Sequence, residues 1–519
     1  MARLASWLLG RDRSEPISYE LTRFVLLRAL GFVYLAAFFS LHDQVLGLLG
    51  SEGLTPAALY LERIDAHFGG GFEALWAVPT VFWVDVSDVA LRGLALLGIV
   101  AAAVVTLGYA NAPLMLLLWG IQLSFVSVGQ TWFAFGWEIQ LLETGMLGVF
   151  LCPLLDGRPF PATRTPLVVI GLFRWLLFRM MLGAGLIKWR GDLCWRELTC
   201  LETHFETQPI PHPGSWYFHH LPLPVKHAGV AFNHVAELVA PFFVFGPRGL
   251  RILAGLVVVV FQLNLIVSGN LAFLNWITLV PALACFDDRS YRRVLPRRLL
   301  RAAERRVVAG SVPASRSHVV AAGAFAVLVA VLSIAPVENL LSERQVMNTS
   351  FDPLKLVNTY GAFGSVGKVR NEIVLEGTAD ANPGPDSVWR EYEWKCKPGD
   401  PMRRPCLITP YHMRLDWLIW FAAMGDLERY PWVVSLMVKL LQGDPGALGL
   451  LDTNPFPEAP PKQLRALLYR YQFTEPGDPS GAWWKREPIG GYVEALSLDD
   501  PRIDPFLLRH GLPVSSRGS

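Results

Sequence analysis

One polar segment, enclosed by two long apolar runs, constrains this chain more than any other feature. Residues 181–237 read MLGAGLIKWRGDLCWRELTCLETHFETQPIPHPGSWYFHHLPLPVKHAGVAFNHVAE. The middle carries two cysteines and five histidines, and the apolar run that follows contains His234 and Glu237. Ionisable side chains at membrane depth are costly unless they are paired, so they mark a functional site or a helix-packing network. The sequence therefore predicts apolar helices around a polar site.

The chain as a whole is apolar enough for a polytopic membrane protein. Of its 519 residues, 52% are hydrophobic and 17% are charged, whereas about a quarter of the residues in a soluble domain are charged. Crossing a bilayer takes about 20 apolar residues, and about nine runs are candidates, which predicts an all-α membrane domain over residues 1–336. The candidates are about Thr22–Ser40, Val89–Tyr109, Ala112–Val128, Phe135–Leu155, Pro166–Ile187, Gly229–Phe245, Leu250–Ser268, Leu271–Phe286 and His318–Ala335.

Positive charge predicts the orientation, because cytoplasmic loops are rich in Lys and Arg. With nine spans, every basic cluster falls on the cytoplasmic side. The clusters hold Arg3, Arg11, Arg13, Arg23, Arg158, Arg164, Arg248, Arg251 and the run at 287–308. Loops 41–88 and 188–228 and the C-terminal region then face the outer aqueous phase. The basic runs are short and lie beside spans, so nothing indicates nucleic-acid binding.

Residues 337–519 form a predicted soluble domain of the α+β class. Aromatic and β-branched residues between Gly, Asp and Pro turns predict strands in its first half, at 356–364, 370–380 and 389–400. Helical periodicity ending at glycine predicts helices at 414–426 and 431–444. The domain is therefore expected to be β-rich, with helices in its second half.

Four of the six cysteines fall in the two predicted outer regions, and they are Cys194, Cys200, Cys396 and Cys406. An oxidising compartment permits disulfides there. Short separations favour the pairs 194–200 and 396–406, but a sequence does not fix connectivity, and four free thiols are the alternative.

The fifth and sixth spans carry the charged residues that are hardest to explain. Arg174 lies about 12 Å inside its span at 1.5 Å per residue and needs an anion. The best candidate is Glu143 in span four, with Glu138 and Glu237 as further possibilities. A structural network of ion pairs is the more common arrangement, and a ligand-binding or catalytic role is the alternative.

Such a catalytic site would use Lys188 or His234 as a general base beside Glu237. Asn233, His234 and Glu237 fall on one helical face. The histidine spacings match no zinc signature, so no metal is expected. The aromatic run Trp216, Tyr217 and Phe218 suits either the membrane interface or a platform for a partner.

Several long strings resemble the lipase maturation factor family. They are GAGLIKWRGDLCWRELTCLETHFETQPIPHPGSWYFHHLP at 183–222, NHVAELVAPF at 233–242, and NTYGAFG, VRNEIVLEGTAD, WREYEWKCKPGD, RLDWLIWFAAM, LYRYQFT and WWKR in the C-terminal half. The resemblance covers about residues 15–490. The membrane half is also distantly similar to the group of the vitamin K-dependent carboxylase and the horizontally transferred transmembrane domain.

This resemblance implies a membrane-anchored folding factor, rather than an enzyme, that acts on immature secreted proteins such as lipases and contacts membrane lipid. It implies no cofactor. The candidate client-binding residues are Trp216, Tyr217, Phe218, Arg414, Asp416, Trp417 and Trp420. Animal members lie in the endoplasmic-reticulum membrane. The excess of arginine over lysine and the compact loops indicate a bacterial member in the inner membrane, facing the periplasm.

The alternative is an intramembrane enzyme or a binder of a lipophilic ligand, similar to the carboxylase. Arg174, Lys188, His234 and Glu237 would then line one pocket within the membrane domain.

Overall fold

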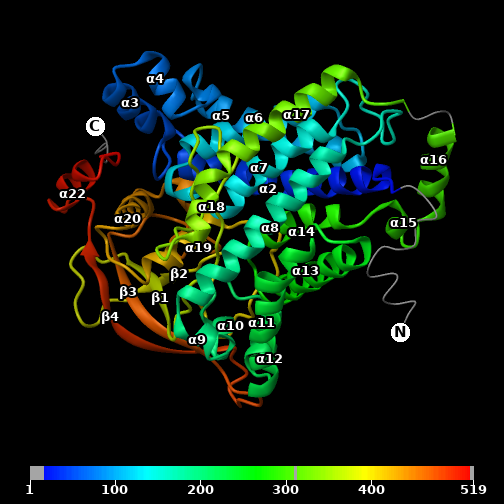
Figure 1. Ribbon diagram of the computed structural model, residues 1–519. Coiled ribbons are helices and arrows are strands. Elements are labelled where there is room, and N and C mark those ends of the chain that lie inside the picture. The colour runs from blue at the N-terminus through cyan, green and yellow to red at the C-terminus, as the bar shows by residue number, and fades with distance from the viewer. Residues whose placement is uncertain (1–16, 309–311, 515–519) are drawn as a thin grey trace.

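The computed structural model describes residues 17–308 and 312–514. Figure 1 shows a helical bundle packed against a smaller part that contains a sheet. Arg3, Arg11 and Arg13, which contribute to the predicted orientation, lie outside the described residues.

Five helical segments among the described residues are long and apolar enough to cross a membrane. They are α2 (Glu20–Leu49), α5 (Asp88–Leu107), α8 (Leu167–Arg190), α13 (Arg248–Ser268) and the consecutive helices α17 (Arg316–Leu332) and α18 (Ile334–Leu341). Nine full-length spans are not confirmed. Three other predicted spans contain shorter helices, namely α6 (Ala112–Val128), α7 (Gly136–Leu151) and α14 (Leu274–Ala282).

The sixth predicted span is not one continuous helix. Helix α12 (Leu223–His234) passes into a π-helical turn at Val235–Val239 and then a 3-10 turn at Ala240–Phe243. Pro241 has no N–H to donate to an α-helical ladder, which favours the break. The wide π turn leaves Glu237 buried inside the bundle, at 4% exposure.

Local sequence fixes the ends of the helices. Helix α5 ends at Gly108, whose φ of 109° suits glycine but few other residues. Helix α6 begins after Asn111, whose side chain accepts a hydrogen bond of 2.9 Å from the backbone N–H of Leu114.

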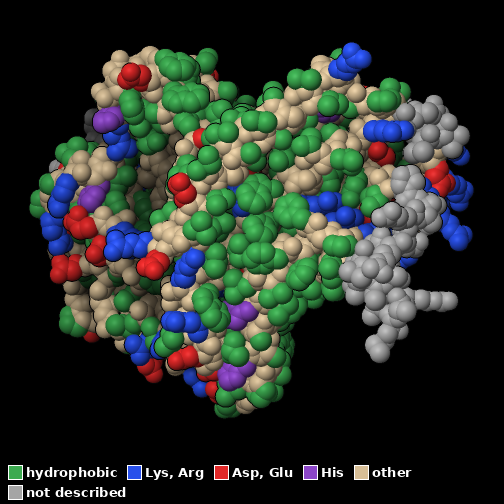
Figure 2. Space-filling view, viewed as in Figure 1, with side chains coloured by type: hydrophobic (Ala, Val, Ile, Leu, Met, Phe, Trp, Pro, Cys, Tyr) green, Lys and Arg blue, Asp and Glu red, His purple; other side chains and the backbone are tan. Residues whose placement is uncertain are grey.

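The two ends of the bundle differ. The loop between α2 and α5 carries α3 (Ala57–Phe68) and α4 (Gly71–Ala77), which lie at the end that bears the C-terminal part (Figure 1). The basic helix α16 (Arg297–Val308) lies at the opposite end (Figure 1). In Figure 2, charged side chains gather toward these two ends, while hydrophobic side chains cover much of the surface between them.

The C-terminal part contains a four-stranded antiparallel sheet in the order β2-β1-β3-β4. The strands are β1 (Arg370–Thr378), β2 (Arg390–Tyr392), β3 (Gln463–Phe473) and β4 (Trp484–Leu496). In the central pair, Val374 of β1 lies opposite Leu467 of β3. The predicted helices are present as α19 (Arg414–Ala422) and α20 (Trp432–Gln442).

One predicted strand, over 356–364, is not formed. Only an isolated bridge between Ser350 and Asn358 involves this stretch. The segment instead lies against the membrane helices, where the side chain of Asn358 is fully buried. Its β-branched and aromatic residues therefore pack on helices rather than in the sheet.

The two halves share one hydrophobic core, which contains residues from both. The last turns of α2 contact α21 (Pro445–Leu448) of the C-terminal part. At this contact an added Cβ on Gly47 would lie only 2.7 Å from the carbonyl oxygen of Gly446, so glycine permits the close approach. The C-terminal part thus covers this end of the bundle.

Candidate functional site

A buried ion pair lies where α8 meets the π-helical turn. The ammonium of Lys188 donates to Glu237 Oε1 at 2.6 Å and to Asn233 Oδ1 at 2.8 Å. The amide of Asn233 donates to the other carboxylate oxygen of Glu237 at 3.0 Å. The side chains of Lys188 and Glu237 are each 5% exposed, so both charges depend on this closed set of partners.

These three residues line a cavity between the membrane helices and the C-terminal part. Its volume is about 130 Å³, close to the roughly 150 Å³ of an engineered cavity that holds benzene. Apolar side chains form much of the wall, including Met180, Met181, Phe232, Phe261, Leu265 and Phe363. The space therefore fits a small apolar group.

One wall of the cavity is polar and uncharged, and it consists of Gln140, Gln262, Asn275 and Thr278. Gln262 accepts from the amide of Asn275 at 2.7 Å, but its own amide nitrogen reaches only the weak acceptor Met181 Sδ, at 3.9 Å. Gln140 donates to Thr278 at 3.2 Å, and its oxygen has no partner among the described residues. A ligand with a hydroxyl and a carbonyl would satisfy both amides.

This polar wall was not among the predicted site residues, because its side chains are uncharged. The available signal was the presence of amide and hydroxyl side chains inside apolar runs, with Asn275 and Thr278 one helical turn apart.

Arg174 and His234 lie elsewhere. The guanidinium of Arg174 donates to the carbonyl oxygen of Ala284 at 2.9 Å and to the hydroxyl of Tyr19 at 2.8 Å. The prediction that a carboxylate partners Arg174 is therefore wrong. His234 Nε2 lies 2.9 Å from the carbonyl oxygen of Trp195, and neither Arg174 nor His234 lines the cavity.

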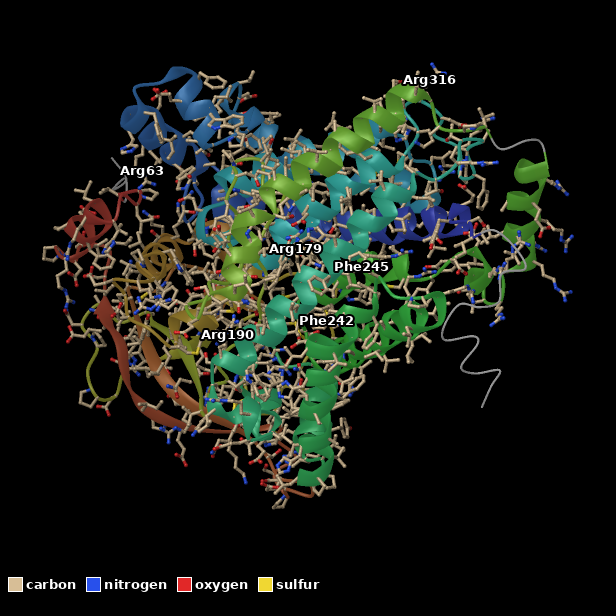
Figure 3. All side chains as sticks on the ribbon, in the orientation of Figure 1. Arg63, Arg179, Arg190, Phe242, Phe245 and Arg316 are labelled. Atoms are coloured by element: carbon tan, nitrogen blue, oxygen red, sulfur yellow. A yellow bond between two sulfur atoms is a disulfide. The ribbon has the colours of Figure 1, made fainter. Side chains whose placement is uncertain are left out.

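Glu143 instead pairs with Arg179, which lies near the middle of the view in Figure 3. The other oxygen of Glu143 accepts from the Tyr360 hydroxyl at 2.7 Å and from the backbone N–H of Asn358 at 3.0 Å. This network fastens the segment after α18 to α7 and α8, which is a structural role.

The first predicted disulfide, Cys194–Cys200, is present. It closes the loop that holds Trp195, whose indole N–H donates to the carbonyl oxygen of Phe363 at 2.8 Å. The ammonium of Lys188 lies 4.9 Å from the centre of the Trp195 ring, within cation–π range. The disulfide thus supports one side of the cavity.

His204 lines the same cavity and is 6% exposed. Burial, together with a smaller effect of the nearby Lys188 ammonium, lowers the pKa of its imidazole to about 4. His204 is therefore neutral near pH 7. No group of three or more His, Cys, Asp or Glu side chains within 17–308 and 312–514 is placed to hold a metal ion.

A second buried ion pair joins the two halves of the molecule. Arg414 of α19 lies 2.8 Å from Glu138 Oε1, at the start of α7. Gln122 donates to the other oxygen of Glu138 at 2.7 Å. Gln44 of α2 accepts from the backbone N–H of Arg414 at 2.8 Å and donates to the carbonyl oxygen of His412 at 2.7 Å. We call these five residues the docking seam.

Two family models match the chain. The model described as Lipase maturation factor transmembrane domain matches residues 21–293, and the model described as Lipase maturation factor C-terminal domain matches residues 356–494. The chain belongs to the lipase maturation factor family.

Relatives in this family match along almost the whole chain. Lipase maturation factor 1 of Bos taurus is 49% identical over 518 residues, covering 95% of this chain and 92% of that protein. The Homo sapiens protein of the same name is 48% identical over 522 residues, covering 96% and 91%. Lipase maturation factor 2 of Mus musculus is 30% identical over 606 residues, covering 94% and 85%. No solved structure matches.

In this lipase maturation factor, the aromatic run of the loop is only partly exposed. The indole N–H of Trp216 donates to the carbonyl oxygen of Thr474 at 3.0 Å, and its ring packs against Trp483. Phe218 is half-buried against Phe205. Tyr217, at 56% exposure, points most clearly to solvent.

The four candidates on α19 lie mainly inside the protein. Arg414 and Asp416 are 1% exposed and Trp417 is 4% exposed, whereas Trp420 is half-buried. Arg414 belongs to the docking seam, so its contribution is to hold the two halves together.

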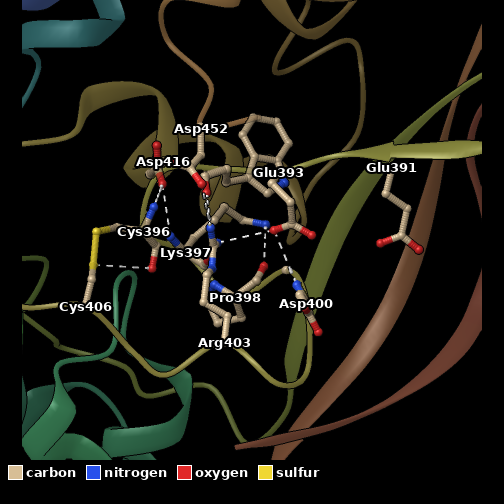
Figure 4. Close-up of polar contacts among 12 residues, drawn as sticks. Glu391, Glu393, Cys396, Lys397, Pro398, Asp400, Arg403, Cys406, Asp416 and Asp452 are labelled. Carbon is tan, nitrogen blue, oxygen red and sulfur yellow. Dashed lines mark hydrogen bonds and ion pairs between the residues drawn. A yellow bond between two sulfur atoms is a disulfide. The ribbon is translucent and has the colours of Figure 1, made fainter. Parts of the chain in front are cut away.

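Asp416 organises the second predicted disulfide, Cys396–Cys406, which is also present (Figure 4). Its carboxylate accepts from the backbone N–H groups of Cys396 at 2.7 Å and Lys397 at 2.9 Å. Burial raises the pKa of Asp416, while these hydrogen bonds act to lower it. The ammonium of Lys397 pairs with buried Glu372 at 2.5 Å. These contacts hold the backbone beside the disulfide in place.

Proposed function

We propose that the chain is a membrane-anchored maturation factor that assists the folding and assembly of exported proteins, with secreted lipases as clients. The observation that carries this proposal is the near full-length relationship to proteins named lipase maturation factor. Because the match covers both halves, the protein has the same two-part construction as those relatives.

The fold gives this proposal a physical form. The C-terminal part covers one end of the bundle, and the Arg414–Glu138 ion pair and the hydrogen bonds from Asn358 and Tyr360 to Glu143 attach it there. A client held by this part would therefore stay close to the membrane surface. We propose that the contact includes Tyr217, the edge of Trp216 and Phe218, and Trp420, while Arg414, Asp416 and Trp417 act indirectly by keeping the surface in place.

We also propose that the C-terminal part faces an oxidising compartment, because it contains one disulfide and the loop 188–228, which packs against it, contains the other. That compartment is the periplasm in a bacterium and the lumen of the endoplasmic reticulum in a eukaryote. The compared relatives are vertebrate proteins, so they give no support to the bacterial source expected from the sequence.

Expression of a secreted lipase in cells that lack a maturation factor tests the proposal. Adding this chain should increase the active lipase in the medium, and the Tyr217→Ser variant should reduce that increase without changing the amount of factor. Phe72→Ser, at a side chain that is 74% exposed in α4, is the matched control. Unchanged lipase activity with the wild-type chain, for a panel of dimeric and monomeric lipases, would contradict the proposal.

A second candidate function rests on the cavity. The cavity suits a small lipophilic ligand with one polar end. Its wall contains Lys188, Asn233 and Glu237, and the side-chain oxygen of Gln140 lacks a hydrogen-bond donor among the described residues. Mass spectrometry of an organic extract of the purified protein would detect such a molecule. It should be present in a fixed ratio to the protein and be lost in Ala184→Phe, a change in the cavity wall. An extract containing only bulk membrane lipid would count against this candidate.

A further inference from the structure

A large apolar groove runs along the lipid-facing side of the bundle, apart from the cavity described above. Its volume is about 670 Å³. Side chains from α2, α13, α14 and α16 line it, and they include Phe32, Leu263, Trp276 and Leu299. Leu263 is 46% exposed and Phe32 36% exposed, so the groove opens at the surface of the bundle.

One end of the groove holds a single guanidinium, that of Arg28. Its Nε donates to the carbonyl oxygen of Thr106 at 3.3 Å, and Nη2 donates to that of Leu107 at 2.6 Å. Arg28 thus caps the last carbonyls of α5. Its Nη1 is shielded from solvent and finds no hydrogen-bond acceptor in the part of the chain that the structure describes. The guanidinium lies 3.6 Å over the ring of Phe24, and Arg28 as a whole is half-buried, so an anion in the groove can reach the exposed part of the guanidinium.

The depth of Arg28 suits a lipid headgroup. It lies eight residues after Glu20 in α2, which is about 12 Å along the helix axis. It is level with the turn between α5 and α6, where those two apolar helices end. Leu299 of α16 lines the same end of the groove, and Arg297, Arg298 and Arg301 of α16 are exposed. Basic side chains next to a membrane surface attract anionic lipids.

The rest of the groove suits acyl chains. It extends from Arg28 to Trp276, whose ring lies 5.5 Å from that of Phe32. The indole N–H of Trp276 donates to Thr409 in the C-terminal part at 3.0 Å. The groove therefore follows α14 from the basic end of the bundle toward the end that the C-terminal part covers.

We propose that this groove binds one anionic glycerophospholipid from the membrane leaflet beside α16. The phosphate pairs with the exposed part of the Arg28 guanidinium, the acyl chains lie along α2 and α14, and the arginines of α16 favour an anionic headgroup over a zwitterionic one. A guanidinium matches phosphate in both charge and geometry.

Native mass spectrometry of the full chain, released from nanodiscs of equal phosphatidylglycerol and phosphatidylcholine, tests this site. One phosphatidylglycerol should remain bound. Arg28→Gln should reduce its retention about tenfold or more, because a hydrogen bond to a charged group is lost. Arg316→Gln is the matched control, since this exposed arginine begins α17 outside the groove (Figure 3). It should retain the lipid.

Arg28 also caps α5, so a second variant separates binding from folding. Ala29→Phe fills the groove and leaves Arg28 in place. It should expel the lipid while the thermal midpoint without added lipid stays close to that of the wild type. Equal retention in the wild type and both variants would mean unspecific surface lipid only and would overturn the proposal. Equal retention of the two headgroups by the wild type would overturn its anionic selectivity.

Discussion

Two buried ion pairs lie toward the same covered end of the bundle, yet their surroundings differ. Glu138 and Arg414 in the docking seam are at most 1% exposed and lie among aromatic rings, including Phe133 and Trp137. Glu237 and Lys188 are similarly buried but face a cavity of about 130 Å³. Both pairs carry the cost of desolvation. The seam uses its pair to join two halves of the chain, whereas the second pair lines a space that a ligand can fill.

The largest effect expected from this comparison is at the seam. Arg414→Ala leaves the Glu138 charge buried without its main partner, which should reduce the free energy of unfolding by about 3–5 kcal/mol. The thermal midpoint in detergent should fall, and protease should cut between the two halves more readily. Exposed Arg429→Ala is the control and should behave like the wild type. Equal midpoints for the two variants would show that the seam contributes nothing to docking.

Breaking the Lys188–Glu237 pair should reduce the free energy of unfolding by less than Arg414→Ala does. In Lys188→Met, Asn233 still donates to Glu237, and water can enter the adjacent cavity, so we expect a loss of about 2 kcal/mol. The double variant Lys188→Met, Glu237→Leu should recover most of this loss, because no unpaired charge remains. Chemical unfolding in detergent measures the free energy of unfolding of the single and the double variant. A loss as large as that of Arg414→Ala would mean that the two pairs do not differ in the way proposed.

The sequence was sufficient to predict both disulfides, the long apolar helices and two helices of the C-terminal part, because each depends on local composition or spacing. It failed for the partner of Arg174. Glu143 contacts Arg179 instead, five residues further along α8. Five residues correspond to a rotation of about 140° around a helix, so the two arginines face different neighbours. A sequence shows how deep a residue lies in a span, but it does not show which helix that residue faces.

The partners of Arg414 in the docking seam, and those of the neighbouring Asp416, could not be predicted from the sequence for a related reason. Arg414 and Asp416 are charged residues in a short helix, which is typical of a solvent-exposed face. Their partners are Glu138, 276 residues earlier in the chain, and the backbone N–H groups of Cys396 and Lys397. Such long-range contacts are set by packing. The π-helical turn at Glu237 was likewise invisible, because hydropathy does not report helical pitch.

A smaller effect, on the pH dependence of stability, tests whether water reaches the docking seam. Burial and the Arg414 charge hold the pKa of His412 well below its usual value. The unfolded chain therefore binds a proton near pH 6.5 that the folded chain does not bind, so stability falls as the pH drops below 6.5. The expected loss at pH 5.5 is about 1.4 kcal/mol.

The thermal midpoint at pH 7.5 and 5.5 measures this dependence. His412→Phe should remove the part of this loss that comes from His412, because phenylalanine fills the same aromatic cluster without titrating, whereas His204 still titrates. An unchanged pH dependence in this variant would show that His412 is hydrated in the folded protein.

The smallest expected change in stability belongs to Gln140, and it bears most directly on the cavity. Its side-chain oxygen is buried without a partner among residues 17–308 and 312–514, so the folded protein already carries that cost. Gln140→Leu removes the unsatisfied group and should leave the free energy of unfolding within about 0.5 kcal/mol of the wild type, or raise it. If the cavity binds a ligand, the same variant should lose any lipophilic molecule that co-purifies with the protein. A separate assay of lipase activity in the medium then shows whether this loss affects maturation. A clear destabilisation would instead mean that Gln140 is satisfied by ordered water, and the polar wall would then belong to the packing of the bundle in the same way as the docking seam.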